Sequence, residues 1–74
     1  MASPDYQPRA GDRIRVTRRR NGRTHFVKTG VVTEVCLPHG YRWTEDEGGR
    51  RFFLATSEQV ATMPGYSQTI ERIS

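Results

Sequence analysis

The 74-residue sequence has very little cysteine, with Cys36 as its single thiol, and it has no long apolar run. One cysteine excludes an internal disulfide framework and suits a reducing compartment such as the cytoplasm. A membrane-spanning helix needs about 18 apolar residues or more, and no segment approaches that length. The opening MASPDYQPRAG also lacks the apolar segment of a signal peptide. We therefore expect a cytoplasmic protein with no membrane partner.

Groups that would carry catalysis or bind a metal are also scarce. Cys36 and His39 have C-x-x-H spacing and His25 is a third candidate ligand, but a structural zinc site usually needs two spaced pairs. A cysteine nucleophile with a histidine base would need a third group to orient it, and none is evident. A chain this short buries only about 60% of its unfolded surface, so it has little room for a deep cavity. The sequence predicts no enzyme, no metal and no cofactor.

Positive charge is abundant, and it is unevenly placed. The chain has eleven arginines and one lysine, and its formal net charge is +4. Residues 1–37 carry a net charge of +5, whereas residues 38–74 carry −1. A basic half joined to a near-neutral half indicates a directed electrostatic surface.

Short alternating apolar and polar runs recur between turn signals, and no segment has a helical apolar period, which favours an all-β domain. The predicted strands are 12–19, 23–35, 41–45, 50–55 and 66–73, with a helical turn over 57–60 capped by Ser57. Gly30 is a natural bulge or corner position inside the second strand. We expect residues 1–10, with Pro4 and Pro8, to form a flexible leader and residues 11–74 to form one domain.

The segments GDRIRV (11–16) and GVVTEV (30–35) resemble the "G-D-x-V-x-V … G-x-V-x-x-V" pattern of KOW and Tudor-type barrels. A later part of the chain is similar to a strand and turn of small SH3-like proteins of actinobacteria. Its matching residues are Tyr41-Arg42-Trp43, Gly48-Gly49 and Phe52-Phe53. The resemblance covers roughly residues 10–60. It implies a bacterial five-stranded SH3-like barrel with a short helical turn before the last strand. Such barrels bind RNA, DNA, methylated side chains or peptides, so fold alone does not select a function.

The first hairpin closes at Asn21-Gly22, because that dipeptide favours a two-residue turn with positive φ at both central positions. A two-residue loop pairs Arg20 with Arg23, and continuing the pairing without interruption sets Val16 opposite Val27 and Thr17 opposite Phe26. This register buries Val16 and Val27 and leaves Phe26 outside, among cations. The tip is too charged to be buried, so we expect the hairpin to project beyond the barrel as an arm.

Like charges opposite one another on a β-ladder are destabilising, and an anionic partner would remove that cost. Guanidinium groups present a planar fork of donors that suits phosphate. We therefore predict low-specificity nucleic-acid binding through the phosphate backbone, to DNA or RNA, with Phe26 stacking on a base or wedging at a groove. The predicted site residues are Arg13, Arg15, Arg18, Arg19, Arg20, Arg23, His25, Phe26, Lys28 and Tyr41. The alternative is an adaptor or inhibitor that docks on an acidic protein partner, and either could act as a homodimer.

The remaining aromatic residues have two interpretations. Tyr41, Trp43 and Phe53 could form a surface patch that cages cations or stacks bases. Trp43 is instead predicted to lie in the core with Phe52, Leu54 and Val32, which leaves Tyr41 as the surface candidate. The acidic turn 45–47 is expected to keep its hairpin soluble, or to contact the basic arm of its own domain or of a second copy.

Overall fold

The computed structural model describes residues 6–74, which form one antiparallel sheet and a short helix. The strands are β1 (Arg13–Arg20), β2 (Arg23–Cys36), β3 (Gly40–Glu45), β4 (Arg51–Ala55) and β5 (Tyr66–Arg72), and helix α1 (Ser57–Ala61) precedes β5. The predicted all-β class, with five strands and a helical turn before the last, is confirmed, and each predicted boundary lies within one residue of the observed one. The cap was predicted one residue late, because the Thr56 hydroxyl accepts the hydrogen bond from the Gln59 amide.

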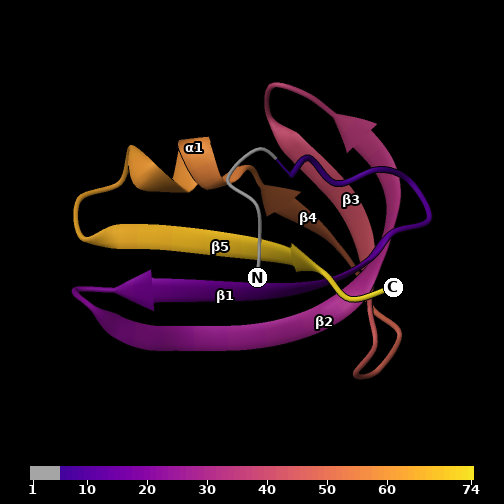
Figure 1. Cartoon of the computed structure of the whole chain (residues 1–74), viewed down its shortest axis with the longest axis horizontal. Coiled ribbons are helices and arrows are strands. Elements are labelled where there is room, and N and C mark those ends of the chain that lie inside the picture. The colour runs from indigo at the N-terminus through magenta and orange to yellow at the C-terminus, as the bar shows by residue number, and fades with distance from the viewer. Residues whose placement is uncertain (1–5) are drawn as a thin grey trace.

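The sheet has the order β4-β3-β2-β1-β5, so the long strand β2 pairs with β1 along one half and with β3 along the other. Figure 1 shows β1, β2 and β5 running side by side, with β2 then curving away toward β3 and β4. Gly30 lies at this change of partner, opposite both Ile14 and Glu45. A Cβ atom there would collide with the Thr44 carbonyl oxygen and approach the Trp43 ring to 2.8 Å. The predicted corner at Gly30 therefore requires glycine, because β2 and β3 approach too closely there for any side chain.

The hydrophobic core lies on one face of the curved sheet, which we call the inner face. Its buried members come from four strands and are Ile14, Val16, Val32, Tyr41, Trp43 and Leu54, while Tyr6, Phe26 and Ile70 pack against them partly buried. Val60 of α1 is also completely buried. The predicted core positions of Trp43, Val32 and Leu54 are confirmed.

Two aromatic residues have the opposite exposure to that predicted. Tyr41 was expected on the surface but is only 4% exposed, because it lies opposite Leu54 on the same face as Trp43. Burial raises the pKa of the Tyr41 hydroxyl above its ordinary value. Phe52 was expected in the core but is 45% exposed. It faces the same side as its partner Trp43, yet it lies toward the end of that face, beside Lys28.

The β1–β2 hairpin extends past the hydrophobic core, as predicted, but not as a two-stranded ribbon. Strand β5 pairs with β1 along nearly its whole length, from Ile14 opposite Arg72 to Arg20 opposite Tyr66. The turn is also bound to the α1–β5 connection, where the backbone N–H of Asn21 donates a hydrogen bond of 2.7 Å to the Gly65 carbonyl. The basic tip is consequently the end of a three-stranded layer (Figure 1).

The segment before β1 packs on the domain from Tyr6 onward. Pro8 is buried, and the Tyr6 hydroxyl donates a 2.7 Å hydrogen bond to the Asp12 carboxylate. The Arg9 amide donates to the same carboxylate oxygen. Residues 6–10 of the predicted leader therefore belong with the folded domain, and residues 1–5 lie outside the described residues.

Candidate functional site

The turn at the tip of the hairpin has the predicted geometry. Asn21 has φ of 52° and Gly22 has φ of 79°, which are the positive values that a two-residue primed turn requires. The turn sets Arg20 directly opposite Arg23, and both side chains are exposed. The predicted pairing of two arginines next to the turn is therefore confirmed.

Beyond the turn, the predicted register is wrong. The ladder shifts between Arg18 and Arg19, so that His25 is an extra residue in β2 and Arg18 lies opposite Phe26. Val16 then pairs with Lys28 rather than with Val27. A β-bulge of this kind offsets all later pairs by one residue, which moves each side chain to the other face.

The bulge changes the environment of Phe26 in particular. Phe26 lies half-buried on the inner face and packs against the core, whereas Val27 is 54% exposed on the opposite face. The Arg18 guanidinium carbon lies 4.9 Å from the centre of the Phe26 ring, and the Lys28 ammonium nitrogen lies 5.1 Å from it. The prediction that Phe26 stands outside and stacks on a base is thus corrected, because the ring already holds two cations of its own chain.

Arg18 is engaged within the fold as well. Its Nε and one terminal nitrogen donate hydrogen bonds of 3.0 and 2.6 Å to the Gln68 side-chain oxygen. Partial burial lowers the pKa of the Arg18 guanidinium, since desolvation disfavours its charged form. Arg18 therefore stabilises the β1–β5 pair and is not a freely exposed cation at the tip.

Three further basic site candidates have carboxylate partners. Arg13 lies 2.6 Å from Asp46, and the Thr29 hydroxyl donates to the same carboxylate. Lys28 lies 3.4 Å from Glu45, so the acidic turn does contact the basic hairpin. The Arg15 guanidinium is 3.9 Å from the Glu71 carboxylate. The charge of these three side chains is largely balanced where they stand.

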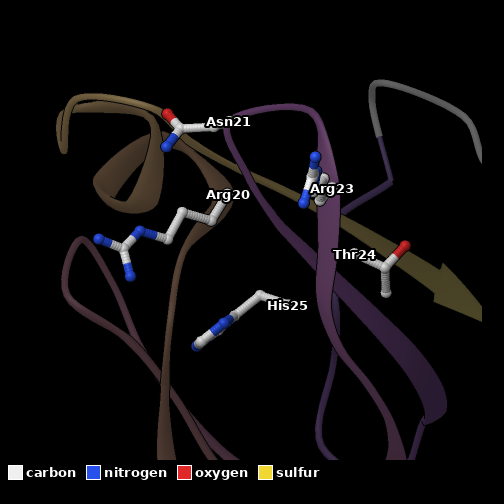
Figure 2. Close-up of a pocket in the computed structure, with 5 residues that line it drawn as sticks. All are labelled: Arg20, Asn21, Arg23, Thr24 and His25. Atoms are coloured by element: carbon white, nitrogen blue, oxygen red, sulfur yellow. The ribbon is translucent and has the colours of Figure 1, made fainter.

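The tip differs from the rest of the hairpin in this respect. Among residues 6–74, no ion pair involves Arg19, Arg20 or Arg23, and all three are exposed. Arg20, Arg23 and His25 line a shallow pocket, and in Figure 2 the Arg20 and His25 side chains extend to the same side of the hairpin. The tip therefore concentrates positive charge that the described part of the chain does not neutralise.

Sequence reasoning missed an aromatic feature beside this charge. Four rings follow one another on the inner face, which we call the aromatic row: Tyr66, His25, Phe26 and Phe52. The His25 ring is edge-on to Tyr66 at 6.1 Å and tilted to Phe26 at 5.8 Å. Cations accompany the rings: the Arg20 guanidinium carbon lies 5.7 Å from the centre of Tyr66, and the Lys28 ammonium lies near both Phe26 and Phe52, 5.7 Å from the centre of Phe52. The row joins three strands through long-range pairing, so local sequence contained no sign of it.

The described residues bring no three histidine, cysteine or acidic side chains together in a metal-binding arrangement. No helix in residues 6–74 is long and apolar enough to cross a membrane. Comparison of the chain with models of protein families, with curated proteins and with solved structures gave no match.

Proposed function

We propose that the protein binds nucleic acid with low sequence specificity, through phosphate contacts made by Arg19, Arg20 and Arg23 at the tip of the β1–β2 hairpin. One observation carries the proposal: these exposed arginines lie outside the ion pairs formed among residues 6–74, whereas Arg13, Arg15 and Lys28 have carboxylate partners. Phosphate oxygens suit guanidinium forks, and phosphate contacts position a protein without reading sequence.

The arrangement of the tip supports this proposal further. Arg19 pairs with Thr24 and Ser67 on the outer face, whereas Arg20 pairs with Arg23 and Tyr66 on the inner face. Positive charge therefore borders both faces of the three-stranded tip. Since β5 and Gly65 hold the hairpin, the arginine backbones are ordered before a ligand arrives, which reduces the entropy lost on binding. In this proposal the protein is an SH3-like barrel that acts in the cytoplasm.

Fluorescence anisotropy with labelled DNA and RNA, measured over a series of salt concentrations, tests the proposal. Binding should weaken steeply as salt rises, because cations bound to phosphate are released on association. Changing Arg19, Arg20 and Arg23 together to Gln should lower the slope of log K against log salt by about 2–3. No binding by the wild-type protein near physiological salt would overturn the proposal.

The matched control changes Arg13, Arg15 and Arg42 to Gln, which removes the same amount of charge. Each of these arginines has a carboxylate partner within 4 Å, at Asp46, Glu71 and Glu34 respectively. The control should keep a salt slope within about 1 of the wild-type value. Equal losses in both triple variants would show that net charge, and not the tip, determines binding. Capture of an acidic protein after nuclease treatment, with no nucleic-acid binding, would favour the adaptor function instead.

A further inference from the structure

We infer that the nucleic acid bound at this site is single-stranded, with unpaired bases lying against the aromatic row while the tip arginines contact phosphates. The inference rests on the proposed function and adds the class of nucleic acid. It starts from an unusual position: Phe52 lies on the inner face opposite the buried Trp43, yet 45% of it is exposed.

The rings and the tip arginines share one face. Arg20 and Arg23 pair across the turn, and Arg20 also lies opposite Tyr66, so these side chains face the same side of the sheet as the aromatic row. Because His25 is the extra residue of the bulge, its ring contacts Tyr66 and Phe26 on that side. A chain of phosphates held at the tip would therefore have aromatic rings within reach of its bases.

The rings are not equally available to a base. Phe26 and Tyr66 are half-buried, whereas Phe52 stays 45% exposed although Lys28 lies 5.7 Å from the centre of its ring. His25 and Phe52 are the exposed members, so they are the two positions where a base can lie on a ring. Cations lie over Tyr66, Phe26 and Phe52, which keeps positive charge along the row.

This chemistry selects unpaired bases. In a duplex the base faces are stacked within the helix, and only the base edges are reachable from the grooves. Single strands offer the faces themselves, and proteins that bind them without sequence preference combine a basic track with aromatic rings. Each stacked base contributes enough that losing one ring typically lowers affinity about 10-fold.

Phe53 provides an internal comparison for Phe52. It is the next residue of β4 and is 54% exposed, but it pairs with Arg42 and so faces the outer side of the sheet. A phenylalanine exposed singly on a surface is common and needs no ligand to explain it. The two neighbours therefore separate a general effect of exposed rings from an effect of the inner face.

The test measures the affinity of the full chain for an oligothymidine, for a duplex of equal length, and for an abasic oligomer with the same number of phosphates. We expect the oligothymidine to bind most tightly. Phe52→Ala should weaken oligothymidine binding about 10-fold and leave both the salt slope and duplex affinity unchanged. Phe53→Ala should bind like the wild type. Phe52→Leu, which keeps an apolar side chain but no ring, serves if the alanine variant unfolds. The same measurements with oligouridine distinguish DNA from RNA as the single strand.

The outcomes separate the two proposals. Equal affinity for oligothymidine, duplex and abasic oligomer, with no effect of Phe52→Ala, would overturn the inference and leave the proposed function standing. Equal losses in Phe52→Ala and Phe53→Ala would also overturn it, because the inner face would then have no special part. No binding to any of the oligomers would overturn both.

Discussion

The side chains of Arg18 and Gln68 connect two strands and reach a third. The Arg18 guanidinium donates two hydrogen bonds to the Gln68 side-chain oxygen, at 3.0 and 2.6 Å, while the Gln68 amide nitrogen donates to the Ala55 carbonyl at 2.8 Å. Since β4 and β5 are the two edges of the sheet, this single amide spans the distance between them. One polar side chain thus bridges the sheet edges near the basic tip.

Replacing Gln68 by Ala should destabilise the protein by about 1.5–3 kcal/mol, because a hydrogen-bonded charged group and a backbone carbonyl both lose their partner. Urea unfolding followed by the fluorescence of Trp43 measures this loss. The control is Thr69→Ala, an exposed neighbour on β5, which should stay within about 0.5 kcal/mol of the wild type. Equal stability of both variants would show that the Arg18–Gln68 contact contributes nothing.

Stability should depend on pH through the Tyr6–Asp12 hydrogen bond, which needs a protonated phenol and an ionised carboxylate. The hydrogen bond from Tyr6 lowers the pKa of Asp12 below its ordinary value of 3.8, whereas burial first and the bond second raise the pKa of Tyr6 to about 12. The Asp12 contribution is therefore present above pH 3.8 and lost as pH falls through the folded-state pKa. The Tyr6 contribution is present below pH 10 and lost as pH rises toward 12.

Thermal unfolding between pH 2 and 12 measures both the acid and the alkaline loss of stability. Tyr6→Phe should reduce the alkaline loss, leaving the part that buried Tyr41 contributes. It should also reduce the acid loss without removing it, because Asp12 keeps its Arg9 amide and its contact with Arg72. Tyr66→Phe is the control and should retain both. An unchanged alkaline loss in Tyr6→Phe would contradict the assignment.

The docking of the hairpin turn should be sensitive to Gly65. This residue has φ of 82°, and an added Cβ would collide with the Asn21 side-chain oxygen. Gly65→Ala should therefore cost the roughly 1–2 kcal/mol expected for the backbone conformation, with only a small excess for moving the exposed Asn21 side chain away. Gly11→Ala is the control, since it has φ of 93° with open space around it. Adding Asn21→Gly to Gly65→Ala should recover the excess loss, and failure to recover it would exclude the collision as the cause.

Gly30 should tolerate substitution less well than Gly65, because its close contacts include backbone atoms. Gly30→Ala would push against the Thr44 backbone and the Trp43 ring, so we expect a loss of at least about 3 kcal/mol. Since Trp43 is the single tryptophan, its emission spectrum reports the disturbance directly. Gly49→Ala lies at a positive φ with open space around it, so it should cost only the free energy of placing alanine in that backbone conformation. A Gly30→Ala protein as stable as Gly49→Ala would contradict the close approach.

The sequence predicted the elements well because their signals are local. Asn21-Gly22 specifies its turn through positive φ, and strand boundaries follow from alternation and turn residues. The pairing of Arg20 with Arg23 followed directly from the turn. These features depend on neighbours within a few residues, which a single sequence displays.

The side of the sheet on which each of these aromatic residues lies, and how exposed it is, could not be predicted from local signals. Phe26 and Val27 are adjacent, as are Phe52 and Phe53, so in each pair one apolar residue must face outward. For Phe26 and Val27 the choice depends on the bulge at His25, whereas Phe52 and Phe53 take their sides from the β3–β4 pairing, in which Phe52 lies opposite Trp43. Likewise, the engagement of Arg18 depends on Gln68, fifty positions away. Long-range contacts determine these outcomes, and alternation alone does not encode them.

The extra residue in β2 has a consequence for how this chain can vary. His25 lies between a core-forming segment and a basic tip, and it absorbs one position of the alternating pattern. Even-numbered residues such as Phe26 and Lys28 therefore face inward on the core side of the bulge, whereas odd-numbered Arg23 faces inward on the tip side. Because β1 has no extra residue at this point, deleting His25 would keep Arg20 opposite Arg23 and Arg18 opposite Phe26, and would restore one uninterrupted alternation along this part of β2.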